Sequence, residues 1–269
     1  MPHVILDDRA IISISGPEAR AFLQGLVTND LDRLTPSTPL YTALLTPQGK
    51  VLFDFLMFER EGSLLIDCAR ESRDGLAKRL SIYRLRAKVS IATRDELAIA
   101  AQWAMPQTGL PQDPRVSALG GRDVVPRDDK TLEVSAYLDH RLRLGVPESS
   151  DFGSDRMFAL DADLEELHAV AFDKGCYVGQ ELTARMKHRG TARKRLLPIE
   201  SKTGELPSVD AELIAGGRSI GNITSRYGNR GFALVRLDRL DESGDARVEA
   251  DSAEIVVRRP QWLSPETAA

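Results

Sequence analysis

The chain has 269 residues and a net charge of −4, with 42% hydrophobic and 28% charged residues. This length predicts more than one domain, and the acidic balance excludes binding of nucleic acid through overall charge. No apolar run is long enough to cross a bilayer, and the first residues resemble neither a signal nor a transit peptide, so we expect a cytoplasmic protein without a membrane partner.

The N-terminal half alternates predicted strands and helices. Residues 4–6 and 10–15 read as a hairpin-like pair of strands, and the apolar spacing of residues 19–26 predicts a helix. Further strands are expected at 41–45, 51–58, 64–68, 88–92 and 98–103, with helices at 71–83 and 137–144. Asn29 and Asp30 follow the first helix, where they either bond their own backbone in a turn or contact a ligand.

Two aspartates interrupt apolar strands that we expect to be neighbours, Asp54 and Asp67. A carboxylate in such a strand is costly unless it is paired or faces a cleft. In a cleft it can accept two parallel N–H bonds from a guanidine-like edge, such as that of a pterin ring. The alternative is that either aspartate lies at a strand end in water. This interpretation suits Asp67, near the end of its run, better than Asp54 in the middle of one.

A run of positive charge covers the second predicted helix. Residues 70–88 contain seven Lys or Arg and two acids. Such a run is either a solvated helix face or one wall of an anion site. The sequence alone leaves both interpretations open.

The most specific stretch is residues 173–185, which contain one of only two cysteines, Cys176. A strand-like run at 169–172 precedes it and a helix-forming run at 180–186 follows, so Cys176 is expected on a strand-to-helix turn near a helix N-terminus, where Lys174 would help to stabilise a thiolate. The glycines at 175 and 179 indicate a sharp turn or a close approach. The alternative is a structural turn whose thiol points inward.

The residue types argue against cysteine-peptidase chemistry and against an iron–sulfur cluster held by this chain alone. None of the four histidines lies in a recognisable Cys/His pattern for a peptidase. The other cysteine, Cys68, lies in an apolar strand and is expected to be an inert buried thiol. Two cysteines cannot hold an iron–sulfur cluster unaided, and there is no CxxC, so we expect no intrinsic metal site.

The remainder of the chain divides into a basic stretch and a strand-rich region. Residues 182–199 carry six Lys or Arg and no acid, which predicts a positive surface for an anionic partner. RNA is a weak candidate because the interleaved aromatics of single-strand binders are missing. After residue 195, short strands separated by Gly, Pro and Asp predict a small barrel or sandwich.

Residues 174–181 read Lys-Gly-Cys-Tyr-Val-Gly-Gln-Glu, and this octet, with the runs 22–30, 44–50, 83–89 and 141–148, resembles the signature of the YgfZ-type folate-binding proteins. These are iron–sulfur cluster assembly and repair factors with a mitochondrial branch, related to the T-protein (aminomethyltransferase) of glycine cleavage. The resemblance implies an α+β, T-protein-like multi-domain fold around a central cleft. Its parts would be residues 1–92, residues 93–192 with the motif, and a C-terminal β-barrel at 193–269.

The resemblance also implies a tetrahydrofolate-binding accessory factor in assembly or repair of [4Fe–4S] clusters. It would act with A-type scaffold proteins and [4Fe–4S] client enzymes, and Cys176 could share a transient cluster with such a partner. An alternative is a tetrahydrofolate-dependent aminomethyl transferase, against which stands the lone Asp54 where the T-protein has an acidic pair.

The implied site residues fall into three groups. The reactive residues would be Cys176 and Lys174. The folate site would use Asp54, Asp67, Asn29, Asp30, Arg86 and Tyr177. Within this group Arg86, together with Arg185 and Lys187, would meet the glutamate tail or an acidic partner. The rest of the motif consists of Gly175, Tyr177, Gly179, Gln180, Glu181 and Arg185.

Overall fold

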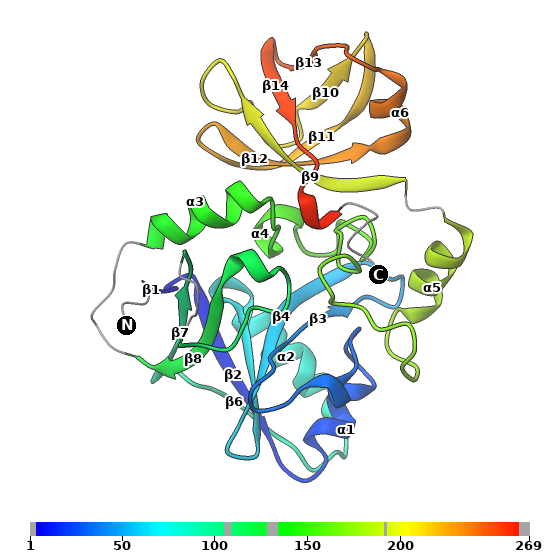
Figure 1. Ribbon diagram of the computed structural model, residues 1–269. Helices are drawn as coiled ribbons and strands as arrows, with labels where there is room; N and C mark the ends of the chain where they lie inside the picture. The colour runs from blue at the N-terminus through cyan, green and yellow to red at the C-terminus, as the bar shows by residue number, and fades with distance from the viewer. Residues whose placement is uncertain (1–3, 105–108, 128–133, 191–192, 264–269) are drawn as a thin grey trace.

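The computed structural model describes residues 4–104, 109–127, 134–190 and 193–263. An α+β body forms the larger part, and a β-barrel stands on one side of it (Figure 1). The last residues of the third predicted part, 264–269, lie outside the described residues.

A five-stranded antiparallel sheet is the centre of the body. Its strand order is β3-β4-β5-β2-β6. The three apolar runs predicted at 41–45, 51–58 and 64–68 are confirmed as consecutive strands. The bounds are β2 (Arg9–Ser15), β3 (Leu40–Leu45), β4 (Val51–Arg60), β5 (Ser63–Ala69) and β6 (Ser90–Thr93).

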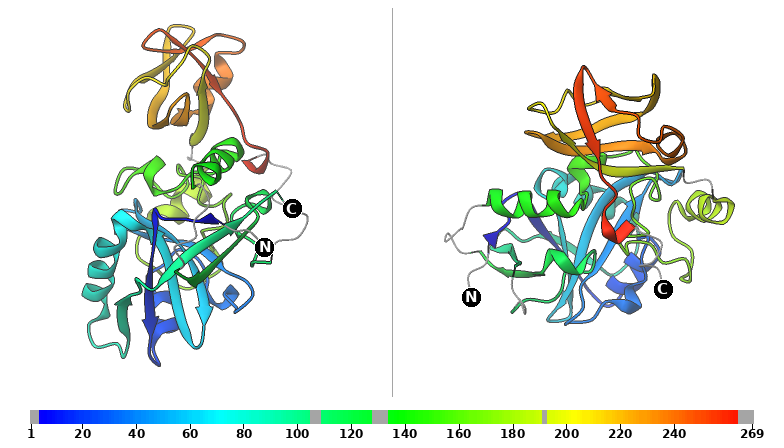
Figure 2. Two further views of the ribbon diagram at one scale, coloured as in Figure 1. Left: turned by 90° about the vertical axis from the view of Figure 1, so that its left-hand side faces the viewer. Right: turned by 45° about the horizontal axis from the view of Figure 1, so that its top comes forward.

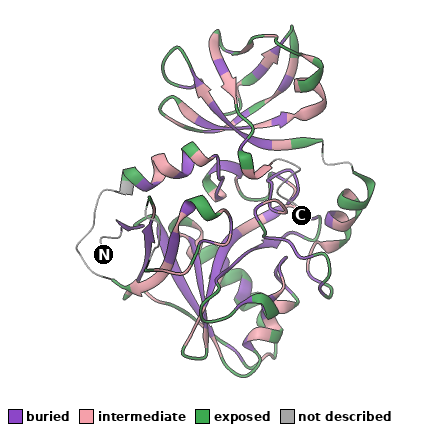
Figure 3. Ribbon diagram, in the orientation of Figure 1, coloured by how far each residue is buried: buried purple, intermediate pink, exposed green. Residues whose placement is uncertain are grey.

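Helices α1 (Ala19–Gln24) and α2 (Arg73–Arg84) pack on one face of this sheet. Leu23 of α1 and Leu76 and Leu80 of α2 are fully buried in one cluster with strand residues. Residues on the other face of α2 are exposed (Figure 3), and in the left view of Figure 2 this helix lies at the outer edge of the body. Apolar residues at helical spacing therefore fix which side of each helix meets the sheet.

The predicted N-terminal hairpin is wrong. Strand β1 (Val4–Ile5) pairs with β7 (Leu97–Gln102), which also pairs with β8 (Gly121–Pro126) in a separate three-stranded sheet. Strand β2 already has β5 on one edge and β6 on the other. Both edges of β2 are filled, so β1 joins the second sheet.

The middle of the chain is mostly irregular. Helices α3 (Val134–Leu144) and α4 (Ser149–Phe152) precede a long connection to α5 (Gln180–Arg189). The strand expected at 169–172 is not formed, because this segment runs along the loop after α1 rather than along a sheet edge. There the Thr28 hydroxyl donates to the Ala169 carbonyl at 2.6 Å, and the Ala171 amide donates to the Thr28 carbonyl at 3.0 Å.

The C-terminal region is a closed barrel and not a sandwich, the two folds that the sequence had left open. The strands close in the order β10-β11-β12-β9-β14-β13 around an aliphatic core. Helix α6 (Leu237–Glu242) covers one side. The bounds are β9 (Lys194–Ser201), β10 (Glu212–Ala215), β11 (Arg218–Tyr227), β12 (Arg230–Arg236), β13 (Val248–Ala250) and β14 (Ala253–Val257). In the described part of the chain there are also four 3₁₀ helices: η1 (Leu31–Arg33), η2 (Arg70–Ser72), η3 (Ser117–Leu119) and η4 (Gln261–Leu263).

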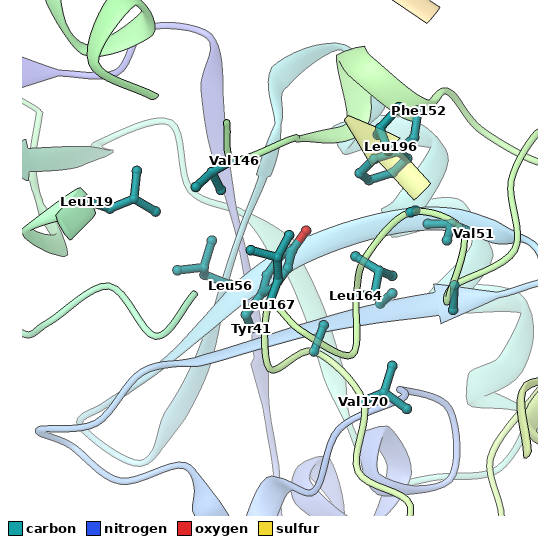
Figure 4. Close-up of a cluster of buried hydrophobic side chains, with 14 of the residues drawn as sticks. Tyr41, Val51, Leu56, Leu119, Val146, Phe152, Leu164, Leu167, Val170 and Leu196 are labelled. Carbon is teal, nitrogen blue, oxygen red and sulfur yellow. The ribbon is translucent and has the colours of Figure 1, made fainter. Parts of the chain in front are cut away.

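One hydrophobic cluster joins the body to the barrel (Figure 4). The connection after α4 contributes Leu164 and Leu167, which lie over Tyr41 of the sheet. Phe152 of α4 and Leu196 of β9 belong to the same cluster. The irregular connection is thus buried between sheet and barrel, and this holds the motif that follows it in place.

Candidate functional site

Lys174 anchors the motif to the body. Its ammonium donates to the backbone carbonyls of Gln24 and Val27 at 2.8 Å and of Asn29 at 2.7 Å. Burial lowers the pKa of Lys174 to about 8. All three N–H bonds of the ammonium are used on carbonyls of the loop after α1. This geometry makes Lys174 a structural clamp, and none of its donors is left for the thiol.

Two more motif residues shape the same loop. Tyr177 is buried, its ring lies 5.3 Å from the Lys174 ammonium, and burial raises its pKa to about 12. Gly179 has φ +83°, and a Cβ there would lie 2.5 Å from the carbonyl oxygen of Thr46. Only glycine satisfies both conditions. Gly175 is different, since a Cβ there would meet nothing within 4 Å.

Cys176 is exposed between these fixed points, whereas Cys68 is buried and burial raises its pKa to about 12. The prediction that Cys68 is a buried thiol is confirmed. Helix α5 begins at Gln180, four residues after Cys176, so the cysteine lies before the helix rather than in its first turn. Among the described residues, no group of three or more His, Cys, Asp or Glu could hold a metal.

Asn29 and Asp30 lie beneath the motif and serve the backbone. The Asn29 side chain donates to the carbonyls of Tyr41 and His168, both at 2.7 Å. Asp30 accepts from the Asp32 amide at 3.0 Å, and this bond and one from Gln24 lower its pKa. Of the two readings of these residues, the turn-forming one describes the contacts seen.

The second group of candidate residues lies inside a buried ionic network. Asp67 is fully buried between two arginines: Arg9 Nε donates to one carboxylate oxygen at 2.6 Å and Arg122 Nε to the other at 2.8 Å. Asp67 is therefore neither in water nor on the wall of a cleft. Two cations fill the positions that a pterin edge would need.

Asp54 is buried and bonded on both oxygens. The Tyr41 hydroxyl donates to Oδ2 at 2.8 Å, and the Ser149 hydroxyl contacts Oδ1. Burial raises the pKa of Asp54, and the nearby Arg9 only partly offsets this. A mid-strand aspartate is thus accommodated by paired hydroxyls, as the cost of burying it requires.

Glu148 completes the network and was not singled out by the sequence. Its Oε1 accepts from Arg115 Nη1 at 2.7 Å, and its Oε2 lies 3.6 Å from Arg9 Nη1. Burial alone would raise its pKa, but Arg141, Arg115 and the other arginines hold it well below its usual range. Arg115 is paired in addition with Asp113, and Arg141 with Asp151.

A pocket of about 380 Å³ opens above this network. Arg9 and Glu148 are the buried polar groups on its wall, and its rim is more exposed. The volume is within the range of small-molecule sites, ~300–1,000 Å³. The lining residues are Asp8, Arg9, Ala69, Arg70, Glu71, Glu148, Ser149 and Ser150.

The predicted site residues therefore form separate groups. Asn29, Asp30 and Tyr177 gather at the motif, whereas Asp54 and Asp67 lie in the ionic network. Arg86 belongs to neither, since it is exposed in the connection between α2 and β6.

Among the described residues, three of the six basic side chains in the stretch at 182–199 are ion-paired, so the positive surface predicted there is partly compensated. Arg185 bonds Glu181 at 2.8 Å, and Lys187 contacts Glu165. Arg195 bonds Glu166 at 2.9 Å. The acids lie outside the stretch that was counted from the sequence: Glu181 ends the motif, and Glu165 and Glu166 come before it.

The residues that sequence reasoning missed are Arg9, Arg115, Arg122, Arg141 and Glu148. Arg9 is the first residue of β2 and Arg122 the second of β8, and a charged residue at the start of a strand is no signal of a buried ion pair. Their pairing with Asp67 joins residues 58 and 55 positions apart. No local pattern shows that distance in sequence.

Comparison with known proteins places these features in context. A family model described as the CAF17 C-terminal β-barrel domain matches residues 193–265. The chain is 30% identical to the mitochondrial iron-sulfur cluster assembly factor IBA57 of Mus musculus, over 96% of this chain and 84% of the relative. It is 32% identical to the IBA57 homologue of Coccidioides immitis, over 89% and 72%.

Among solved structures, the glycine cleavage aminomethyltransferase T from Bartonella henselae superposes with a TM-score of 0.74 at 16% identity, over 97% of this chain and 85% of that one. The predicted T-protein-like fold with a C-terminal barrel is confirmed. The cytoplasmic location is contradicted, because the similar assembly factors are named as mitochondrial.

Proposed function

Because the chain belongs to the family of iron–sulfur cluster assembly factors that includes the mitochondrial IBA57 proteins, we propose that it assists assembly or repair of [4Fe–4S] clusters through Cys176. One observation carries this proposal: Cys176 is an exposed thiol on a loop that is otherwise fixed. Lys174 and Gly179 hold the loop on either side of it.

The iron–sulfur cluster is what the protein handles and not its own cofactor, so the other ligands of the cluster must come from another protein. The described residues hold no group of three or more His, Cys, Asp or Glu side chains that could bind a metal. Cys68 is buried in β5, where its thiol donates to the Ala10 carbonyl of the neighbouring strand β2 at 3.7 Å. A cluster at Cys176 therefore requires thiolates from a scaffold protein or a client enzyme, since iron–sulfur clusters are normally held by four ligands. Cys176 acts as one ligand or as a redox thiol in a shared site.

Activity of [4Fe–4S] enzymes in cells tests this role. Cells that carry Cys176→Ser should lose these activities, and cells that carry Cys68→Ser should keep them. Both variants should fold, because Cys176 is exposed and serine is close in size to the buried Cys68. Normal enzyme activity with Cys176→Ser would remove the thiol from the mechanism.

Tetrahydrofolate is the second part of the proposal, with the pocket above Arg9 and Glu148 as its site. Asp54 and Asp67 have both carboxylate oxygens bonded and do not line the pocket, whereas Glu148 does. Glu148 Oε1 accepts from Arg115, and Oε2, which lies 3.6 Å from Arg9, is the oxygen that would face a pterin edge. Bound there, the folate would supply a one-carbon carrier or a reductant. The chain's residues orient it, with the Ser149 hydroxyl at the pocket wall.

Intrinsic fluorescence provides a readout for folate binding. Trp103 packs against Tyr137 with ring centroids 5.5 Å apart, and the Tyr137 hydroxyl accepts from Arg115 and Arg122 of the network. Tetrahydrofolate should change the fluorescence and raise the melting temperature. The same titration of Glu148→Gln should show weaker binding. No change with the wild-type protein would refute the folate part and leave the role of Cys176 standing.

A transferase is the alternative activity, and the fold alone favours it. Turnover of methylene-tetrahydrofolate with an amine donor would support it. Asp54 argues against a transferase, because both of its carboxylate oxygens already accept hydrogen bonds, from Tyr41 and Ser149.

A further inference from the structure

The end of α2 carries a cluster of cations that the proposed function does not use. We call residues 78–88 the α2 tip. From Gly75 to Thr93 the sequence has five basic residues and no acid. All five side chains are exposed, and within the described part of the chain none makes a side-chain hydrogen bond or ion pair. They are Lys78, Arg79, Arg84, Arg86 and Lys88.

The acids closest in sequence are already bonded. Asp74 and Asp95 both pair with Arg73, at 3.1 and 2.5 Å. Glu18 accepts a hydrogen bond from the Lys88 backbone amide at 2.7 Å and is the carboxylate in contact with the tip. The positive charge of the tip is therefore mostly uncompensated, unlike that of α5. Since the whole chain is net negative, the rest of its surface is more acidic than the chain as a whole.

Two large aliphatic side chains project from the same tip. Leu85 is 87% exposed and Ile82 is 58% exposed. Only two other large hydrophobic residues in the described ranges are exposed, Phe172 at 36% and Val209 at 40%, and both are less exposed than Ile82 and Leu85. Leu85 follows the helix with φ +45°, a conformation that is strained for any residue with a side chain. A strained, solvent-exposed leucine stabilises nothing in the isolated chain, which points to a partner.

We propose that the α2 tip docks on an anionic lipid surface. Leu85 and Ile82 would enter the boundary between headgroups and acyl chains, and the five cations would contact the lipid phosphates. Long, unpaired basic side chains around protruding aliphatic side chains suit the headgroup region of an anionic bilayer, where negative charge is spread over many mobile phosphates. An acidic protein would need placed carboxylates and a cavity for Leu85, whereas a bilayer needs neither.

This proposal differs from the expectation of no membrane partner, which rested on the lack of a spanning segment. No helix in the described part is long and apolar enough to span a bilayer. Peripheral docking needs no span. The acidic remainder of the surface would be repelled, so the protein would bind in one orientation with α2 toward the lipid.

Co-sedimentation with vesicles tests the proposal. Binding is expected to phosphatidylcholine vesicles that contain phosphatidylglycerol, to weaken with salt, and to be far lower with phosphatidylcholine alone. Each basic residue neutralised at the tip should weaken binding about fivefold, and the charge reversals Arg84→Glu and Arg86→Glu should weaken it at least as much. The matched control is Arg218→Glu on the barrel, where the side chain is 79% exposed; it changes the net charge equally and should bind as wild type.

Leu85→Gly separates docking from folding. Glycine relieves the strained φ, so the melting temperature should stay the same or rise. Loss of the aliphatic side chain should nevertheless weaken vesicle binding about tenfold. The control Val209→Ser removes an exposed aliphatic residue from another surface and should leave binding unchanged.

Three results would overturn the proposal. The first is no binding of the wild-type protein to anionic vesicles at low salt. The second is equal binding by Leu85→Gly and by the charge reversals. The third is retention of an RNA or an acidic protein, lost in the same variants, without any vesicle binding. None of these results bears on Cys176, so failure here leaves the proposed function standing.

Discussion

Replacing Lys174 by methionine tests whether this residue is a structural clamp. The change keeps the aliphatic stem and removes the three hydrogen bonds to the carbonyls of Gln24, Val27 and Asn29. A buried acceptor that loses its partner costs ~1–3 kcal/mol. Water can reach part of this site and the cost of burying the ammonium disappears, so we expect a loss of about 3 kcal/mol in the free energy of unfolding.

For a chain of this size such a loss lowers the melting temperature by about 6–12 °C. Calorimetry measures the melting temperature, and urea unfolding measures the free energy. Lys187→Met is the control, because this exposed lysine bonds Glu165 on the surface, where a pair contributes about 1 kcal/mol or less. If Lys174→Met melted like the wild type yet abolished [4Fe–4S] enzyme activity, Lys174 would act chemically and the clamp assignment would be refuted.

Three further changes test the loop, the thiols and a buried acid. Gly179→Ala should cost about 2 kcal/mol or more in unfolding free energy, whereas Gly175→Ala should cost less than about 1 kcal/mol; equal melting temperatures would contradict the close contact at Gly179. In the native protein iodoacetamide should label Cys176 and spare Cys68, and mass spectrometry that finds both labelled at one rate would show that Cys68 is accessible. Burial raises the pKa of Asp163 well above its usual range, so the stability that this carboxyl contributes is present below its unfolded pKa of about 4 and is lost as the pH rises. The variant Asp163→Asn has no carboxyl to ionise, so its free energy of unfolding, measured with urea, should gain on that of the wild type between acidic and neutral pH. A difference that shrinks as the pH rises would contradict the predicted pH dependence.

Local patterns in the sequence predicted the elements that depend on them. The strands at 41–45, 51–58 and 64–68 form as predicted because each apolar run has the length of an ordinary strand and is bounded by turn residues. The helix over 71–83 appears because Leu76 and Leu80 share one face. The hairpin at the N-terminus failed because pairing depends on which strand edges remain free, and that is a property of the whole sheet.

The site shows the same limit. The sequence marked Asp54 as costly to bury, but for Asp67 it favoured a strand end in water, because it could not supply Arg9 or Arg122, which come from other strands. It placed Lys174 next to Cys176 because they are two residues apart. The ammonium instead bonds carbonyls 145 to 150 positions earlier in the chain. Long-range pairing of charges decides both cases, and it becomes visible only in the fold.

The central claim is that Cys176 is the one thiol with which this chain engages a cluster completed by another protein. Anaerobic cluster reconstitution with an A-type scaffold partner, followed by absorption and EPR spectroscopy, tests it most directly. The wild-type protein and Cys68→Ser should give the same cluster signal in complex with the partner, and Cys176→Ser should lose it. A signal of full intensity in Cys176→Ser would contradict the claim and place the cluster elsewhere.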